Sequence, residues 1–165
     1  MIIDTFRRLS VFIALLLVQV LVLNHVFLFG WATILLYVYF VVMFPRNYPR
    51  WAILLWSFAM GLSVDMFANT PGMAAASLTI VGFIQPYLLE LFIPREAPEN
   101  LRTAAATLGL SKFTVFASML VFVHCLLFFS IETFTSFHWQ HWLLSIGGST
   151  FLTLALLMAV ELVRK

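Results

Sequence analysis

The sequence predicts an all-α integral membrane protein, a bundle of six transmembrane helices with both termini on the cytoplasmic side. Three observations lead to this prediction. The 165 residues are 63% hydrophobic and only 10% charged, whereas soluble domains carry about 25% charged residues. The apolar residues fall into runs that approach the roughly 20 residues needed to cross a bilayer. All nine lysine and arginine residues lie at the two ends of the chain or in alternate connections between runs, as expected when one face of the protein is cytoplasmic.

The first two expected spans cover residues 9–25 and 29–44. Arg7 and Arg8 precede the first run, and a long apolar stretch without a small-residue cleavage site predicts a retained helix rather than a removed signal peptide. The second run is the shorter of the two. Pro45 ends it, because proline lacks the amide donor and keeps the preceding residue out of helical geometry.

The third and fourth expected spans cover residues 51–68 and 71–93, and a tight turn joins them. Thr70 followed by Pro71 predicts the start of the fourth helix, with threonine as the N-cap and proline in the first helical turn. Pro94 ends this helix for the same reason that Pro45 ends the second.

The last two expected spans cover residues 113–135 and 141–163. Residues 94–112, between spans four and five, form the only sizeable connection, and a short surface helix is expected there. Membrane contact and a partner-binding face are both open interpretations of that helix. Six spans leave no room for a separate soluble domain, so residues 1–165 are expected to form a single transmembrane domain.

The basic residues predict which connections face the cytoplasm. Lysine and arginine in short loops stay on the cytoplasmic side of a membrane protein. The connections at 46–50 and 94–112, together with both termini, are therefore expected in the cytoplasm. The turns at 26–28, 69–70 and 136–140 are expected on the opposite side. An odd number of spans would destroy this separation, which is the main reason for predicting six.

Small and polar residues repeat at helical spacing in the third and fourth spans. The third span carries Ser57, Gly61 and Asp65 at intervals of four residues. Lipid tails are as apolar as leucine, so membrane helices associate through close packing of small residues and through polar contacts. We expect these two spans to pack closely, and we favour ordinary membrane packing over a substrate groove. The corresponding face of the fourth span holds Gly72, Ala75, Ala76, Thr79, Gly82 and Pro86, and the sixth span offers Gly147 and Gly148 for a similar contact.

Asp65 is an acidic residue between two long apolar runs, and the expected outer half of the bundle offers it no cation. An unpaired carboxylate at the centre of a membrane helix costs about 2.5 to 3.5 kcal/mol on insertion scales. The free N–H groups and the dipole of the fourth helix can stabilise a carboxylate that comes from the preceding helix. The hypothesis is that Asp65 fixes the turn between spans three and four. The alternative is a protonatable acid that couples to a proton or a ligand.

No pattern in the sequence predicts catalysis, a cofactor or a metal site. His138 and His141 are spaced as a metal-binding pair, but no cysteine or acidic pair supports them, and a polar interface turn is the favoured interpretation. His124, inside the fifth span, is expected to be a packing residue. Because nucleophile motifs, phosphate loops and paired catalytic carboxylates are missing from the sequence, we expect a protein that is not an enzyme and binds no nucleic acid.

The stretch ATILLYVYFVVMFPRNYPRWAILLWSFAMGLSVDMFANTPGMAAASLTIVGFIQP resembles the central signature of the MreD family of bacterial rod shape-determining membrane proteins. The motifs cover about the middle third of the chain, while length and topology are similar throughout. Two features depart from the family pattern: GWAT lacks the proline that often precedes the second helix, and Ala68 stands where glycine is common. The features that match are the run LLYVYF, Pro45, Gly61, Asp65, Thr70, Gly72 and the small residues around Ala76.

The resemblance implies a non-enzymatic scaffold in the inner membrane that takes part in cell shape and peptidoglycan synthesis within the cell-elongation (rod) complex. The implied partners are an MreC-like single-pass protein, membrane lipids and, directly or indirectly, RodA, a penicillin-binding transpeptidase and MreB. The family is also similar in architecture to the S components of energy-coupling-factor transporters. The alternative function is therefore a vitamin-binding or other small-molecule-binding transporter subunit, which should have a polar pocket that opens outward.

Overall fold

The computed structural model describes residues 2–25, 27–28, 30, 32–136 and 138–164. Within these residues, five helices are long and apolar enough to cross a membrane, the first together with the short turn that follows it. This confirms the prediction of a helical protein with several helices of the length and hydropathy that a membrane span needs. The five are α1 (Ile2–Leu21), α3 (Arg50–Ala68), α4 (Met73–Phe92), α6 (Leu110–Glu132) and α7 (Trp139–Arg164).

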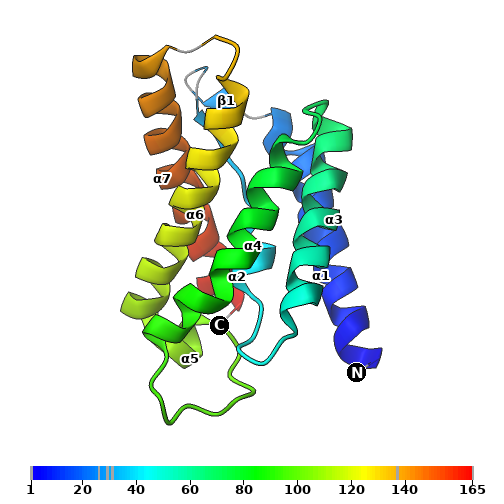
Figure 1. The fold of residues 1–165 in the computed structure, drawn as a ribbon, viewed down its shortest axis with the longest axis vertical. Helices are drawn as coiled ribbons and strands as arrows, with labels where there is room; N and C mark the ends of the chain where they lie inside the picture. Colours follow the sequence, from blue (N-terminus) through cyan, green and yellow to red (C-terminus); the bar gives the residue numbers. More distant parts are fainter. Residues whose placement is uncertain (1, 26, 29, 31, 137, 165) are drawn as a thin grey trace.

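The long helices form one bundle around a central short helix. Figure 1 shows α1 and α3 on one side of the bundle, α6 and α7 on the other, and α4 between the two pairs. The short helix α2 (Val38–Val42) lies in the middle and contacts α1, α3, α4 and α6. The remaining elements are a 3-10 turn η1 (Leu23–His25), the strands β1 (Phe27–Leu28) and β2 (Ala32–Thr33), and α5 (Ala105–Leu108).

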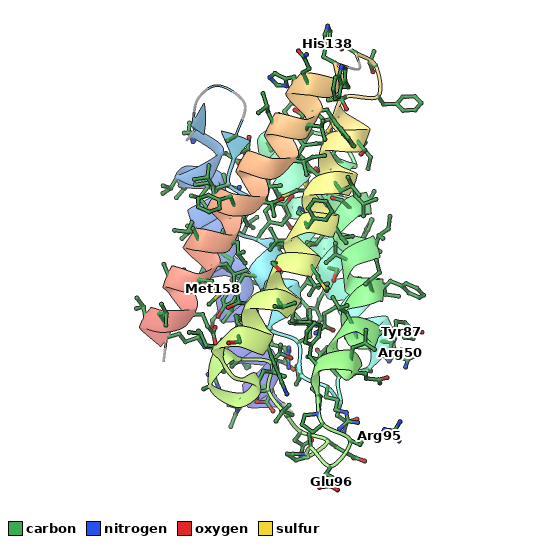
Figure 2. The ribbon with its side chains drawn as sticks, turned by 90° about the vertical axis from the view of Figure 1, so that its left-hand side faces the viewer. Arg50, Tyr87, Arg95, Glu96, His138 and Met158 are labelled. Atoms are coloured by element: carbon green, nitrogen blue, oxygen red, sulfur yellow. The ribbon has the colours of Figure 1, made fainter. Side chains whose placement is uncertain are left out.

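Basic residues gather at one end of the bundle. Figure 1 shows that α1 begins and α7 ends at this end, where the α2–α3 connection and the loop before α5 also lie. We call it the basic end. In Figure 2, Arg50 and Arg95 lie toward this end, and His138 lies at the other. The Arg50 guanidinium donates a hydrogen bond of 2.9 Å to the Tyr87 hydroxyl and lies 4.7 Å from the centre of its ring.

The predicted helix over residues 29–44 is wrong where the structure describes this stretch. Its place is taken by β2, two residues without regular structure, a turn at Leu36 and Tyr37, and the five residues of α2. A helix over the predicted range would rise only about 24 Å, which is less than the roughly 30 Å of bilayer hydrocarbon. Extended backbone, as in β2, rises more than twice as far per residue, so a segment that is only partly helical covers this distance with the same number of residues.

Residues 32–44, which we call the crossing segment, run from the β1–β2 pair toward the basic end (Figure 1). Apart from the half-buried Thr33 and Met43, every residue in this segment is buried. Tyr37, Val38, Val41, Val42 and Phe44 are completely inaccessible. Non-helical backbone at membrane depth is tolerated only where protein surrounds it, and the five long helices supply that surrounding here.

Candidate functional site

Asp65, at the end of α3, accepts hydrogen bonds from the start of α4. Its Oδ1 accepts 2.9 Å bonds from the Thr70 hydroxyl and the Ala74 N–H, and its Oδ2 accepts a 2.9 Å bond from the Ala75 N–H. The side chain is only 3% exposed. The two amides belong to the second and third residues of α4, which have no partner within the helix. The expected contact between this carboxylate and the free N–H groups of the next helix is therefore confirmed.

The prediction that Thr70 caps the fourth helix is wrong. The helix begins at Met73, and the N-cap position belongs to Gly72, which has a φ of 82°. Asn69 turns the chain with a left-handed φ of 58° and donates its N–H to the Asp65 carbonyl. This turn delays the start of α4, so Asp65 rather than Thr70 reaches the open amides. An ionised acceptor also makes a stronger hydrogen bond than a hydroxyl.

The close approach of α3 and α4 is confirmed at two glycines. A Cβ atom added to Gly61 would lie 2.5 Å from the Ala75 Cα, and one added to Gly82 would lie 2.4 Å from the Ser57 Oγ. Real Cβ atoms essentially never come so near to another heavy atom. Both positions therefore depend on the missing side chain to let the two helices meet.

Two of the other predicted small residues, Ala76 and Gly147, do not make the expected contact. Ala76 is exposed on the outer side of α4, and a Cβ added to Gly147 would meet nothing within 4 Å. Both residues lie on helix faces that turn away from the neighbouring helices. Pro45 follows the crossing segment at the basic end, whereas Asp65 lies at the other end of α3. The candidate residues Gly61, Asp65, Thr70 and Gly72 thus belong to the contact or the turn between α3 and α4, while Ala76 lies on the outer face of α4 and Pro45 lies outside the hairpin.

The first half of the crossing segment is held by side chains from α1 and α7. The Gln19 amide donates a 2.9 Å bond to the Ile34 carbonyl and accepts a 3.0 Å bond from the Leu36 N–H. The hydroxyls of Ser149 and Thr153 each accept a 3.0 Å bond, from the Thr33 and Leu35 N–H groups respectively. These three side chains replace the hydrogen bonds that a regular helix would have made.

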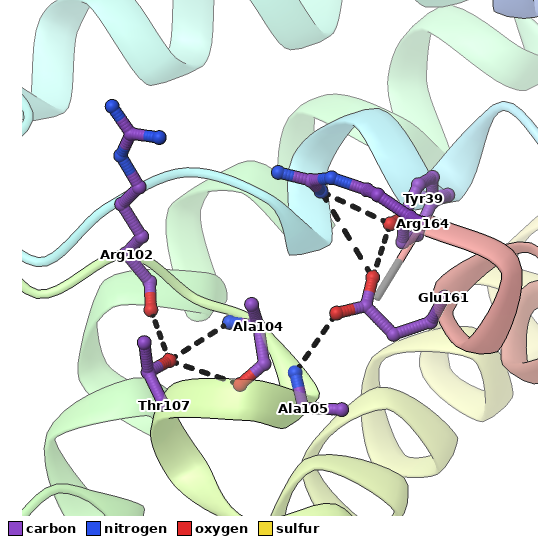
Figure 3. Close-up of polar contacts among 7 residues, drawn as sticks. All are labelled: Tyr39, Arg102, Ala104, Ala105, Thr107, Glu161 and Arg164. Atoms are coloured by element: carbon purple, nitrogen blue, oxygen red, sulfur yellow. Dashed lines mark hydrogen bonds and ion pairs between the residues drawn. The ribbon is translucent and has the colours of Figure 1, made fainter.

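Two tyrosines in the middle of the crossing segment reach polar residues on the last two long helices. The Tyr37 hydroxyl lies 2.9 Å from His124 Nε2, inside the bundle. The Tyr39 hydroxyl donates to Glu161 Oε2, and the Ala105 N–H donates a 2.9 Å bond to Glu161 Oε1. Figure 3 shows this second cluster, in which Arg164 also contacts Tyr39. The expectation of a packing role for His124 agrees with its complete burial.

The end of the crossing segment is held at the Phe44 carbonyl. This oxygen accepts a 3.1 Å bond from the Gln85 amide and a 2.7 Å bond from the Thr103 hydroxyl. Gln85 lies on α4, one residue before Pro86, and Thr103 lies in the loop before α5. The segment is therefore held along its length by residues distant in sequence.

A pattern in the final predicted span indicates these contacts. The prediction treated this span as an ordinary apolar helix and did not use the pattern. Five residues of α7 recur at intervals of four, and all five are buried. Such spacing places them on one helix face, so a polar stripe on the final span predicts a polar partner inside the bundle. The stripe consists of Ser145, Ser149, Thr153, Leu157 and Glu161.

A cavity of about 320 Å³ opens at the end of the bundle opposite the basic end. Leu35, Val64 and Phe128 supply apolar walls, and the hydrogen-bonding groups come from several elements. This mixture suits a small ligand that is partly apolar and partly polar. Among the described residues, no cluster of three histidine, cysteine or acidic side chains could hold a metal ion. The polar residues of the cavity are Asn24, His25, Thr33, Tyr37, Thr70 and Glu132.

Comparisons of this chain with protein-family models, with curated proteins and with solved structures give no match.

Proposed function

We propose that the protein is a non-enzymatic scaffold of the bacterial cell-elongation complex in the inner membrane, with both termini in the cytoplasm. The proposal starts from the resemblance to the MreD family. The resembling residues Gly61, Asp65 and Thr70 join α3 to α4 in this structure, by close packing and by hydrogen bonds. Residues that stabilise the packing of two helices fit a protein whose function is to hold partners in place.

The observation that carries the proposal is the use of polar side chains inside the bundle. Gln19, Thr153 and Asp65 all bond to backbone groups of the chain itself. Glu161 does so as well, at the Ala105 N–H. Polar groups within a membrane are costly and usually mark function, and here they fix an irregular segment and a tight hairpin. This favours a rigid body that presents its surface to other proteins.

The outer face of α3 is the surface that we assign to an MreC-like single-pass helix. Its large apolar side chains are well exposed and follow helical spacing along the whole element. Close packing against α4 fixes the opposite face of the same helix. A transmembrane partner could therefore pack along α3 without disturbing the bundle. The residues of this α3 stripe are Trp51, Leu55, Phe58, Leu62 and Met66.

Photo-crosslinking in native membranes tests this assignment. A photoreactive amino acid replaces Leu62 on the α3 stripe in one variant and Leu144, which is also exposed and lies on α7, in a control. We expect the Leu62 variant to capture a single-pass cell-elongation protein, identified by mass spectrometry, and the Leu144 variant to capture much less of it. Equal capture from both positions, or recovery of transporter ATPase subunits instead, would contradict the proposal.

The cavity at the end opposite the basic end favours one second candidate, a small-molecule-binding subunit similar to a transporter S component. Its opening and its mixed lining match the pocket expected for that function. Native mass spectrometry of the purified protein tests it. A retained small molecule that is lost from Asn24→Ala and Glu132→Gln variants would favour transport, particularly if ATPase subunits copurify.

A further inference from the structure

A second, larger cavity of about 660 Å³ lies at the basic end, between the start of α1, the α2–α3 connection and the loop before α5. We call it the basic groove. Four arginines and one aspartate line it, a net formal charge of +3 (4 − 1). These charged residues come from α1, the loop and the end of α7: Asp4, Arg7, Arg8, Arg102 and Arg164.

Most of these arginines have no carboxylate partner. Among the described residues, the ion pair between Arg164 and Glu161, at 3.9 Å, is the one salt bridge. Figure 3 shows the Arg102 guanidinium extending away from Glu161. The electrostatic neighbours of Arg8 include both Asp4 and Arg102, so the groove concentrates positive charge around a single acid. An anion that entered the groove would therefore meet charges that the protein itself leaves largely uncompensated.

Aromatic rings orient one of these charges. The Arg8 guanidinium lies 4.1 Å from the centre of the Tyr48 ring and 5.2 Å from that of Phe44. Contact with a ring uses the face of the guanidinium, while its N–H donors project from the edge in a geometry that matches phosphate oxygens. Arg8 is therefore positioned to donate hydrogen bonds into the groove.

The groove also has an apolar side that continues to the membrane-facing surface. Phe40, Met43 and Val11 contribute to its lining, and so does Trp51, which is 70% exposed. Tryptophan is enriched at the boundary between membrane and water. On α1, Leu9 is exposed beside the arginines. A ligand in this place can keep a charged group among the arginines and an apolar part against lipid-facing side chains.

We infer that the basic groove binds the headgroup phosphate of an anionic membrane phospholipid. Arginine recognises phosphate through charge-assisted hydrogen bonds, often two at a time. A free phosphate would satisfy the arginines alone, whereas a phospholipid also uses the apolar lining and the exposed face of α1. The lipid is therefore the occupant that matches both halves of the groove.

Lipid binding to the purified full chain in a neutral detergent tests the inference, because neutral micelles remove the general attraction of an anionic membrane. Native mass spectrometry measures binding of phosphatidylglycerol and of zwitterionic phosphatidylethanolamine to the wild type and to Arg7→Gln/Arg102→Gln. The control, Arg95→Gln/Lys112→Gln, removes the same charge from exposed residues outside the groove. We expect phosphatidylglycerol binding to weaken by roughly tenfold or more in the groove variant and to stay within about twofold in the control.

Three results would overturn the inference. Equal loss in the two double variants would mean that only total charge matters. Equal binding of both lipids by the wild type would mean that the groove does not select anions. Displacement of phosphatidylglycerol by millimolar inorganic phosphate, with the same dependence on the groove arginines, would identify a soluble anion as the ligand instead.

A variant that is expected to bind lipid more tightly separates a direct effect on the groove from a loss of binding caused by misfolding. Asp4 is exposed and is the acidic residue of the groove lining, so Asp4→Asn removes the charge that repels phosphate while leaving the arginines in place. We expect this variant to bind phosphatidylglycerol several-fold more tightly than the wild type. Unchanged or weaker binding would count against a headgroup site at this position.

Discussion

At the residue scale, Asp65 illustrates how backbone amides stabilise a buried carboxylate in a membrane hairpin. Its hydrogen-bond donors lie close to it in the sequence, since Thr70, Ala74 and Ala75 follow it in the next turn and helix. Charged acceptors gain more from such bonds than neutral ones. The helix dipole of α4 adds a favourable contribution of the same sign.

Replacing Asp65 with asparagine tests this role. Asp65→Asn keeps one acceptor oxygen but turns an amide donor toward the N–H of Ala74 or Ala75. We expect a loss of about 1–3 kcal/mol in the free energy of unfolding, measured in detergent by titration with sodium dodecyl sulfate. Glu90→Gln, an exposed acid on the same hairpin, is the control and should change stability little. Equal stability of the Asp65 variant and the wild type would contradict the role assigned here.

Two glycines provide a matched test of helix packing. Gly61→Ala places a methyl group against the α4 backbone, and overpacking of this kind costs about 1–3 kcal/mol. Gly147→Ala places the same group in open space on α7, where alanine's helix propensity should raise stability by up to about 1 kcal/mol. Thermal unfolding of both purified variants measures the difference. A Gly61 variant as stable as the Gly147 variant would show that the α3–α4 approach is looser than described.

These residue-scale features could be predicted largely because they are local. Gly61 and Asp65 lie one turn apart on one helix, and the carboxylate's partners begin the next element, so spacing alone indicated the contact. The capping role was assigned to Thr70 instead, because a threonine–proline pair is typical of a helix start. What the sequence did not reveal is the left-handed Asn69, which moves that start to Met73.

At the element scale, the crossing segment is an irregular backbone held by remote side chains. Ser149 and Thr153 bond to residues more than a hundred positions earlier in the chain. A sequence pattern within the segment reports only that it is apolar, so a helix and a buried extended stretch give the same hydropathy. The arrangement could not be predicted without knowing that α7 directs a polar stripe at this backbone.

Removing these side chains should destabilise the crossing segment selectively. Gln19→Leu leaves the Ile34 carbonyl and the Leu36 N–H without their partner, at a cost of roughly 2–4 kcal/mol. Thr153→Val frees only the Leu35 N–H and should cost about 1–2 kcal/mol. Hydrogen exchange should rise at residues 34–36 in both variants before the rest of the bundle opens.

Thr114→Val is the matched control for these two changes. The Thr114 hydroxyl donates to the Leu110 carbonyl within its own helix, so its loss leaves no amide of another element unpaired. We expect wild-type exchange at residues 34–36 in this variant. Faster exchange in the control to the same degree as in Thr153→Val would mean that the crossing segment is not specifically held by α7.

At the scale of the whole molecule, the crossing segment determines which connections lie at the same end of the bundle. Five long helices alone would place the N-terminus at the opposite end from the loop at 45–49, but the crossing segment returns the chain to the basic end before α3 begins (Figure 1). The distribution of basic residues in the sequence predicted that the N-terminus and this loop lie at the same end, even though the predicted helix over residues 29–44 was wrong. The charge of a connection does not depend on the conformation of the segment that leads to it.

Cysteine labelling tests this organisation most directly. In a chain carrying Cys125→Ser, which removes the single native cysteine, new cysteines are introduced one at a time by Asp4→Cys, Asn47→Cys and His138→Cys. A membrane-impermeant maleimide is then applied to intact cells and to inverted vesicles. We expect Asp4→Cys and Asn47→Cys to be labelled from the same face and His138→Cys from the other. Labelling of positions 4 and 47 from opposite faces would contradict this organisation, because the segment between α1 and α3 would then not cross the membrane.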